Sequence, residues 1–202
     1  MATRLVLIRH AAVDTRSRLC GSLNLSLSQA GRADLNALLR RPARGEAPVA
    51  LFTSTLRRAT EVACELGRVW GLEPEPADWA REIDCGDVEG MPVEHLQQRL
   101  PDVWTRNEAQ HDDNFAWPGG ETYAQFRARV MRGLDLAAAP YPAARVVVVT
   151  HAGVVSQVLG VINSRPACVW QPDRPGPLTA TEVLWENGGP RTVLSFNDPD
   201  WY

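Results

Sequence analysis

Two short apolar runs, far apart in the chain, end in the same way. Residues 4–8 read Arg-Leu-Val-Leu-Ile and run into Arg9 and His10, while residues 145–150 read Arg-Val-Val-Val-Val-Thr and run into His151. Continuous apolar runs of this length are typical of strands buried on both faces, which occur in parallel sheets covered by helices. The sequence therefore predicts an α/β three-layer sandwich, with a mostly parallel central sheet flanked by helices.

The other segments alternate between strand-like runs and stretches with helical spacing. Leu35, Leu38 and Leu39 form one apolar stripe, and Ser28 ahead of them is a suitable N-cap. The same criteria predict helices at 28–40, 56–70, about 93–99, 121–138 and 153–160, a surface loop at 40–48, and strands at 49–54, 179–187 and 191–197, the last two antiparallel at the sheet edge. Strands alternating with helices are what an α/β sandwich requires.

Residues 72–120 interrupt this alternation. They contain five prolines, at positions 74, 76, 92, 101 and 118, and we expect only the one short helix among them. We interpret the segment as an excursion above the sheet that shapes a substrate pocket, within a single domain spanning residues 1–202. Trp104 and Trp117 lie in it and are candidates to line that pocket.

The charge and composition of the chain limit the kinds of molecule that it can bind. A net charge of −3 over 202 residues argues against nucleic-acid binding through bulk charge, so a bound anion must meet a local cluster of cations. No apolar run is long enough to span a bilayer or to form the core of a signal peptide. The four cysteines are widely spaced without a C-x-x-C pair, which predicts neither a disulfide framework nor a zinc site. We expect a cytoplasmic protein, with a homodimer as an open alternative.

Charged and titratable side chains follow the two apolar runs. Ligands of open α/β sheets bind beyond the carboxyl ends of the strands, so Arg9, His10 and His151 can meet at one edge. Ala152 and Gly153 allow a tight turn into the next helix, whose N-terminal N–H groups suit an anion. The pattern predicts a site for a phosphate dianion.

A third source of cations and a set of carboxylates complete the candidate site. Arg57 and Arg58 open the helix after residues 49–54, and arginine suits phosphate because its planar fork donates two parallel hydrogen bonds. Cleavage of a phosphoester also needs an acid to protonate the leaving oxygen. Residues 81–90 supply four candidates, which spacing alone does not rank: Glu82, Asp84, Asp87 and Glu89.

Taken in order, these segments resemble the motifs of the histidine phosphatase superfamily, the phosphoglycerate mutase-like group. The resemblance covers about residues 4–160 and is carried by LIRHA (7–11), CGSLNLSLSQAGRAD (20–34), STLRRAT (54–60), REIDCGDVEG (81–90), PGGETYAQFRARV (118–130) and VVVVTHAGVV (146–155). The match of STLRRAT to the family pattern points to Arg58 rather than Arg57.

The resemblance implies both a fold and a reaction. The fold is the phosphoglycerate mutase-like α/β sandwich, and the reaction is hydrolysis of a phosphomonoester without a metal or other cofactor. His10 is implied as the nucleophile that becomes a phosphohistidine. Arg9, Arg58 and His151 are implied to hold the phosphoryl oxygens, and Glu82 to protonate the leaving oxygen.

The implied substrate is a small phosphorylated metabolite. The spacing of CGSLNLSLS and the short chain are most similar to the α-ribazole phosphatase branch, which makes α-ribazole phosphate a candidate. Two alternatives stay open, a phosphoglycerate mutase-type phosphoryl transfer and a non-catalytic phosphate-binding regulatory module. The presence of both His10 and Glu82 favours an enzyme.

The chain departs from the family pattern near the expected substrate contacts. Arg16 stands where the family often has a phosphate-contacting asparagine, and we treat it as a candidate substrate-binding residue. Ser22, Ala152 and Gly153 are the other candidates for substrate binding. Further departures are Ala11 for the usual glycine, Asn24 and Ser26 for an aspartate and a proline, and Thr55 for a proline.

Overall fold

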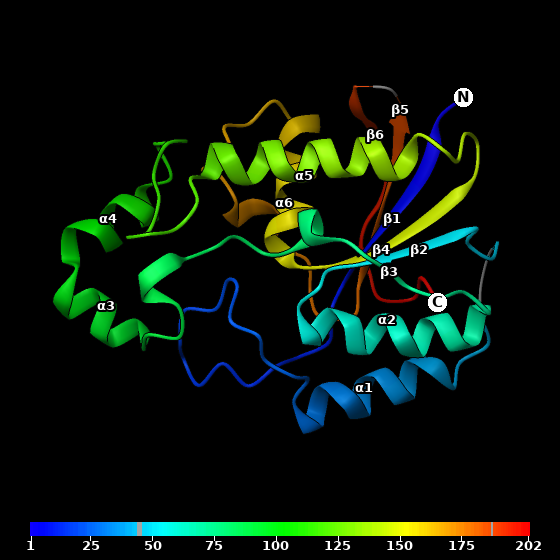
Figure 1. Ribbon diagram of the computed structural model, residues 1–202, viewed down its shortest axis with the longest axis horizontal. Helices are drawn as coiled ribbons and strands as arrows, with labels where there is room; N and C mark the ends of the chain where they lie inside the picture. Colours follow the sequence, from blue (N-terminus) through cyan, green and yellow to red (C-terminus); the bar gives the residue numbers. More distant parts are fainter. Residues whose placement is uncertain (44–45, 187) are drawn as a thin grey trace.

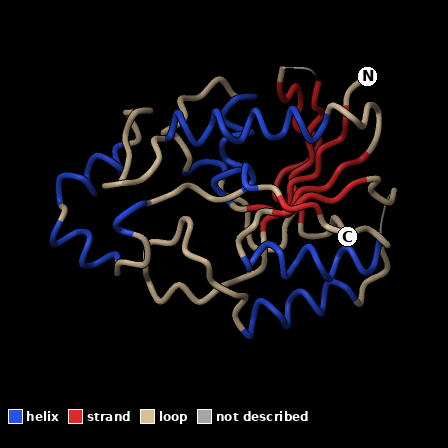
Figure 2. Tube along the Cα trace, in the orientation of Figure 1, coloured by secondary structure: helices blue, strands red, loops and turns tan. Residues whose placement is uncertain are grey.

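The computed structural model describes residues 1–43, 46–186 and 188–202 and centres on one six-stranded sheet (Figures 1 and 2). The strand order is β3-β2-β4-β1-β5-β6. The strands are β1 (Thr3–Arg9), β2 (Ala50–Thr53), β3 (Glu75–Pro76), β4 (Arg145–Thr150), β5 (Ala180–Glu186) and β6 (Gly189–Asp198). The first four in the sheet are parallel, β5 pairs antiparallel with β1, and β6 pairs antiparallel with β5. The mostly parallel sheet predicted from the sequence is confirmed.

Helices cover both faces of this sheet, which confirms the three-layer sandwich. Helices α1 (Gln29–Leu39) and α2 (Arg57–Trp70) lie on one side, and α5 (Tyr123–Ala138) and α6 (Ala152–Ile162) on the other (Figure 1). Side chains alternate along β1, so Val6 and Ile8 pack with α1 and α2, while Leu5 and Leu7 pack with α5 and α6. Each such side chain contributes roughly 1.5–3 kcal/mol by leaving water.

Local capping sets the helix bounds within about two residues of the expected ones. The Ser28 hydroxyl accepts a hydrogen bond from Gly31 N at 3.0 Å, so α1 begins where the sequence predicted. Thr122 and Gln125 form a reciprocal capping box that starts α5 at Tyr123. Helix α2 ends at Trp70 and is capped by Gly71, whose left-handed φ of 68° suits glycine.

The excursion between β3 and α5 contains more helix than the sequence indicated. The short helix expected at 93–99 is α3 (Val93–Arg99), and a second helix, α4 (Pro101–Ala109), follows it directly. We expected irregular chain there because of Pro101, but proline is well tolerated at the first position of a helix, where its missing N–H has no partner to lose. Short 3₁₀ turns lie at Asp78–Ala80 and Gly86–Val88.

The excursion has an apolar core of its own, which we call the outer cluster. It consists of Cys85, Val88, Leu96, Phe115, Trp117, Tyr123, Ala167 and Cys168. Ile83 packs against both this cluster and the core under α5 and α6. The expectation of a single domain over residues 1–202 stays a prediction.

Strands β5 and β6, the last two in the chain, form the expected antiparallel pair at the sheet edge. Strand β6 starts at Gly189, so part of the expected Gly-Gly-Pro turn belongs to the strand. Trp201 and Tyr202 fold back onto the core under α1 and α2, and Trp201 Nε1 donates to Leu178 O at 2.7 Å. They do not line the cavity described below. Residue 187 of the predicted strand and residues 44–45 of the predicted loop lie outside the described residues.

Within the described ranges, no helix is long and apolar enough to cross a membrane.

Candidate active site

Strand register brings the two histidines together. β1 and β4 pair in parallel with Arg9 opposite Thr150, so His10 and His151 follow at the same edge of the sheet. His10 N also donates to Thr150 O at 3.0 Å. The two imidazole rings meet edge to face with their centroids 5.0 Å apart. Both side chains are almost fully enclosed, at 6% and 0% exposed.

His10 is held in one tautomer with a bare Nε2. Its Nδ1 lies 2.7 Å from Ala11 O, which can only accept, so Nδ1 carries the proton. Nε2 then accepts from Arg58 Nε at 3.1 Å. Burial and then the Arg58 charge together lower the pKa of His10 to about 3, against a smaller raising effect of the Ala11 hydrogen bond. The imidazole is therefore neutral at physiological pH, with a lone pair on Nε2.

Arg58 contacts both histidines of the site. It lies in the first turn of α2, is 2% exposed, and its Nε reaches His10 Nε2 and also His151 Nδ1 at 3.2 Å. Its Nη1 and Nη2 atoms donate to Leu23 O at 2.6 Å and Gly21 O at 2.7 Å. Backbone carbonyls thus fix the guanidinium without neutralising its charge, and burial lowers its pKa.

His151 caps the carboxyl end of β4 and precedes α6. Because its Nδ1 accepts from Arg58, its Nε2 carries the proton and donates to Ser54 Oγ at 2.7 Å. Burial, followed by the charge of Arg58 and the proximity of His10, holds the pKa of His151 well below its ordinary value. An approaching phosphate dianion would counter the Arg58 field.

Arg9 projects from the end of β1 into the same space. Its Nη1 donates to Pro175 O at 2.6 Å, while its buried Nε has no hydrogen-bond partner among the described residues. Burial lowers its pKa, and the nearby Arg174 charge lowers it further. A free buried N–H donor beside His10 fits an oxyanion ligand.

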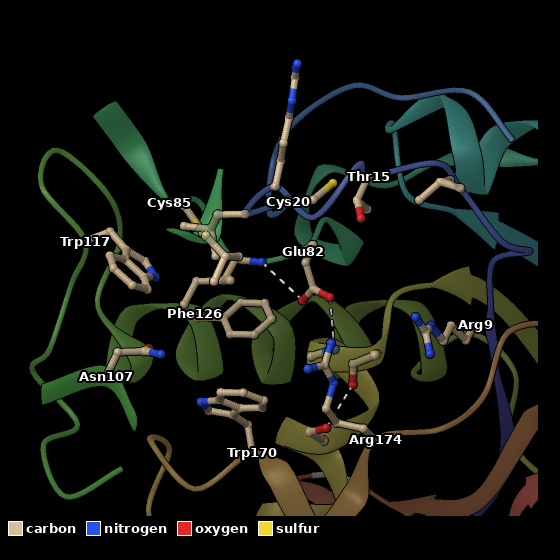
Figure 3. Close-up of a pocket in the computed structure, with 18 of the residues that line it drawn as sticks. Arg9, Thr15, Cys20, Glu82, Cys85, Asn107, Trp117, Phe126, Trp170 and Arg174 are labelled. Carbon is tan, nitrogen blue, oxygen red and sulfur yellow. Dashed lines mark hydrogen bonds between the residues drawn. The ribbon is translucent and has the colours of Figure 1, made fainter. Parts of the chain in front are cut away.

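Glu82 faces this group from the excursion, at the N-terminus of α6 (Figure 3). Its carboxylate accepts from Gly153 N at 3.0 Å and from Ile83 N at 3.3 Å. The approach is close enough that a Cβ added at Gly153 would lie 2.1 Å from Glu82 Oε1. Only glycine at position 153 leaves room for the carboxylate there.

A cavity of about 550 Å³ joins most of these residues. Of the candidates from the sequence, Arg9, His10, Arg58, Glu82, Ala152 and Gly153 line it, as do Trp104 and Trp117. His151 lies behind Arg58, fully buried.

Arg16 and Ser22 are not among the residues that line the cavity. Arg16 is solvent-exposed and pairs with Asp14 at 3.4 Å. The Ser22 hydroxyl bonds to Glu89 at 3.0 Å. The roles of Arg16 and Ser22 in substrate binding stay predictions.

The structure adds residues that sequence reasoning did not assign. Ser54, inside the quoted STLRRAT motif, orients His151. Glu89 accepts from the N–H groups of Gly21, Ser22 and Leu23, and so fixes the loop whose carbonyls hold Arg58. The sequence pointed to Glu89 only as one of the four acidic residues in the segment 81–90.

Arg174 lines the cavity from an irregular segment with no periodicity to reveal it. Its guanidinium carbon lies 5.0 Å from the centroid of the Trp170 ring. No hydrogen bond or ion pair of this side chain is found within the described part of the chain. Arg174 therefore adds an uncommitted cation to the cavity wall.

Comparison with known proteins agrees with this geometry. The family model of the histidine phosphatase superfamily (branch 1) matches residues 5–199. A metal-independent phosphoserine phosphatase of Arabidopsis thaliana is 27% identical over 160 residues, which are 77% of this chain and 67% of the plant protein. Mycobacterial relatives at 30% identity are longer, and the match covers 43% of their length.

Solved structures show the same fold. The mycobacterial glucosyl-3-phosphoglycerate phosphatase superposes with a TM-score of 0.81 at 26% identity, over 98% of this chain and 100% of that one. A proposed α-ribazole-5′-P phosphatase from Escherichia coli gives 0.84 at 20% identity, over 98% of each chain, and is a likeness of fold alone. With two arginines and two histidines gathered at the sheet edge and a family match along nearly its whole length, the chain belongs to the histidine phosphatase superfamily, branch 1.

Proposed function

We propose that this protein is a metal-independent phosphomonoesterase that hydrolyses a small phosphorylated metabolite through a phosphohistidine on His10. The observation that carries the proposal is the His10 tautomer. Its Nε2 is unprotonated and lies beside Arg58, and His10 lines the cavity. A neutral imidazole with an unprotonated nitrogen needs no base to become a nucleophile once the substrate displaces the Arg58 hydrogen bond.

In the first step, His10 Nε2 attacks the phosphorus of the monoester. The N–P bond forms as the bond between phosphorus and the leaving oxygen breaks. Glu82, in its acid form, gives its proton to the leaving oxygen, which departs as an alcohol. Phosphohistidine and a Glu82 carboxylate remain.

In the second step, water attacks the phosphohistidine. The Glu82 carboxylate takes a proton from the water, the N–P bond breaks, and inorganic phosphate leaves. His10 returns to its neutral form, with the Nδ1 proton kept in place by Ala11 O. Glu82 ends the cycle as an acid, so protons balance.

Positive charge around His10 supplies the electrostatic stabilisation. Arg58 Nε donates to the nucleophile, and Arg9, whose Nε has no partner among the described residues, lines the same cavity. Phosphoryl oxygens would take these donors in place of His10 and His151. Preorganised donors of this kind typically contribute about 10²–10³-fold each to turnover.

α-Ribazole phosphate is our candidate substrate, supported by the spacing of residues 20–28 and by the fold of the proposed Escherichia coli phosphatase. Related proteins are named as phosphatases of phosphoserine and of glucosyl-3-phosphoglycerate, so other small phosphorylated metabolites are also candidate substrates. A mutase-type transfer or a non-catalytic phosphate-binding role are the alternatives. We place the protein in the cytoplasm, without a nucleic-acid or membrane partner, and a homodimer stays open.

The test is phosphate release from a panel of phosphomonoesters in EDTA, with the His10→Ala variant alongside. The panel holds p-nitrophenyl phosphate, α-ribazole phosphate, phosphoserine, 3-phosphoglycerate, a sugar phosphate and a nucleotide. We expect turnover that EDTA does not affect, loss of that turnover in His10→Ala, and an acid-labile phosphoryl group trapped on the wild-type protein.

Three results would contradict the proposal. Loss of activity in EDTA that added metal restores would remove its metal independence. Transfer of phosphate between hydroxyls of phosphoglycerate at a rate above its release would favour the mutase. Phosphate binding with equal, negligible turnover in wild-type and His10→Ala proteins would favour the non-catalytic module.

A further inference from the structure

The cavity is larger than the chemistry needs. About 550 Å³ lies within the range of pockets that enclose drug-sized ligands. The reacting groups occupy one end, where Arg9 and Glu82 lie, and Figure 3 shows the space continuing away from them toward Trp117, Asn107 and Trp170. A phosphoryl group with a three-carbon acid would leave that second end unfilled.

The walls of the second end are aromatic. Trp117 and Phe126 are almost fully buried, and Trp104 lies beside Trp117 with ring centroids 6.3 Å apart. Trp170 faces Phe126 across the space (Figure 3). Aromatic walls favour a flat ring in offset or edge-to-face contact over a flexible polar chain.

The polar groups at this end are few and mostly committed. Asn107 accepts from the Tyr123 hydroxyl at 2.6 Å and donates to Glu108 at 3.3 Å. Trp170 Nε1 is buried, lies near the Tyr123 hydroxyl and makes no hydrogen bond of normal geometry within the described residues. Two charged side chains lie near this end: the Glu108 carboxylate, which accepts from Asn107 and opposes a second anionic group on a ligand, and the Arg174 guanidinium, which lies over the Trp170 ring.

The wall formed by Trp170 is fixed before any ligand arrives. Arg127, on α5, donates to Arg165 O at 2.7 Å and Pro166 O at 3.0 Å. Gln157, on α6, accepts from Arg127 and donates to Ala167 O at 2.8 Å. These bonds fasten the segment before Trp170 to two helices, so binding a ring there costs little ordering of the protein.

We propose that Trp104, Trp117, Phe126 and Trp170 form a subsite for a planar, uncharged aromatic ring carried by the leaving alcohol. The proposal rests on the phosphomonoesterase function above and narrows its substrate class. The ring lies between the tryptophans while the ester phosphorus sits at His10. Esters of small anionic alcohols, such as phosphoserine and phosphoglycerate, use the catalytic end alone.

The first measurement compares kcat/KM for 2-phenylethyl, 2-cyclohexylethyl and ethyl phosphate. All three are primary alkyl esters, so the chemical step is similar and differences report on the leaving group's binding. We expect 2-phenylethyl phosphate to exceed ethyl phosphate by about tenfold or more, the range of aromatic stacking in protein sites. It should also exceed the cyclohexyl ester, whose ring is not flat.

Variants locate the effect. Trp170→Leu lies on a partly exposed wall and should fold. It should lower kcat/KM for 2-phenylethyl phosphate by about tenfold and leave ethyl phosphate within about twofold of wild type. Trp117→Leu should do the same, although its burial in the outer cluster makes folding the first check. Trp70→Leu, at the end of α2 against Trp201, is the matched control and should change neither.

Binding separates this subsite from the reaction. Calorimetry of 2-phenylethyl and ethyl phosphate with His10→Gln measures the ring's contribution without turnover. Absence of turnover in the wild type together with ring-dependent binding would overturn the function and keep the subsite. Normal turnover with equal kcat/KM for the three alkyl esters would overturn the subsite and keep the function.

The competing outcome is a preference for leaving groups that carry a carboxylate, which Arg174 would bind. If Arg174 pairs with a carboxylate on the leaving group, 3-phosphoglycerate will be preferred to 2-phenylethyl phosphate, and Arg174→Gln will abolish that preference. This result would overturn the aromatic subsite. We expect Arg174→Gln to leave the preference for the phenyl ester over ethyl phosphate in place.

Discussion

At the scale of single residues, burial decides the chemistry of the site. His10 and His151 are both neutral because the protein shields them from water and places a buried guanidinium between them. Arg58 keeps its charge because two backbone carbonyls accept from it without cancelling it. A lysine there would keep one charge and lose the fork that reaches four acceptors from one plane.

The low pKa of His10 makes stability depend on pH. The folded pKa is about 3, against 6.5 for an ordinary histidine. Between these values the unfolded chain binds more protons than the folded one, so stability falls as the pH falls. We expect His10 alone to remove about 2 kcal/mol of unfolding free energy between about pH 7.5 and about pH 5.

Urea unfolding of wild type and His10→Gln at the two pH values measures this term. On acidification, the unfolding free energy of the variant should fall by about 2 kcal/mol less than that of wild type. The decrease that remains in the variant comes from His151. His95→Gln, which removes an exposed imidazole on α3, is the matched control. An equal loss in wild type and His10→Gln would contradict the buried neutral state of His10.

At the scale of elements, the N-terminus of α6 places Glu82. The carboxylate accepts from Gly153 N in the first turn of the helix, and the dipole of the helix favours an acceptor there. Glu89 acts in the same way on the loop 21–23, whose carbonyls orient Arg58. Two acidic residues of one segment thus serve different elements of the site.

Gly153→Ala tests the placement of Glu82. The new Cβ would lie 2.1 Å from Glu82 Oε1, so the carboxylate must move away, while alanine itself favours the helix. We expect kcat for an alkyl phosphate to fall about 10²-fold, the typical lower range for losing a general acid. Turnover of p-nitrophenyl phosphate, whose leaving group needs little protonation, should fall much less.

Glu82→Gln should reproduce this dependence on the leaving group if Glu82 is the acid. Equal losses for the alkyl and the p-nitrophenyl esters in Gly153→Ala would show that the glycine serves phosphate binding and not proton transfer. Circular dichroism of each variant checks that the helix is intact.

At the scale of the whole molecule, the catalytic groups come from distant parts of the chain and depend on one assembled body. Helix α5 carries Phe126 in the core under the sheet and Tyr123 in the outer cluster, and Ile83 packs against both. Apolar packing therefore joins the excursion, which supplies Glu82, to the sheet, which supplies His10.

This arrangement predicts one cooperative unfolding transition for residues 1–202. Far-UV circular dichroism follows the helices and strands, and tryptophan fluorescence also reports on the outer cluster through Trp117. The two probes should give the same denaturant midpoint. An earlier fluorescence transition would show that the excursion unfolds separately, and would contradict the single-domain prediction.

The sequence by itself determined the layered fold and most of the catalytic candidates. Continuous apolar strands are stable only where helices cover both faces of the sheet, which predicted the layers. His10 and His151 directly follow two such strands, so locating the strand ends was enough to place both histidines at one edge of the sheet. Capping residues such as Ser28 and Thr122 act on neighbouring backbone, which is why the helix starts were readable to within about two residues.

Tertiary structure alone decided what long-range contacts control. The registers of β1 with β4 and β2 with β4 bring His10, His151 and Ser54 together. Packing of the excursion selects Glu82 over its acidic neighbours for the cavity and turns Glu89 toward the loop 21–23. Arg16 is exposed and pairs with Asp14, and its contact with phosphate stays a prediction from the resemblance. Periodicity and capping report on neighbours within a few residues, whereas burial and charge in this site arise from side chains as far apart in the chain as Arg9 and Arg174.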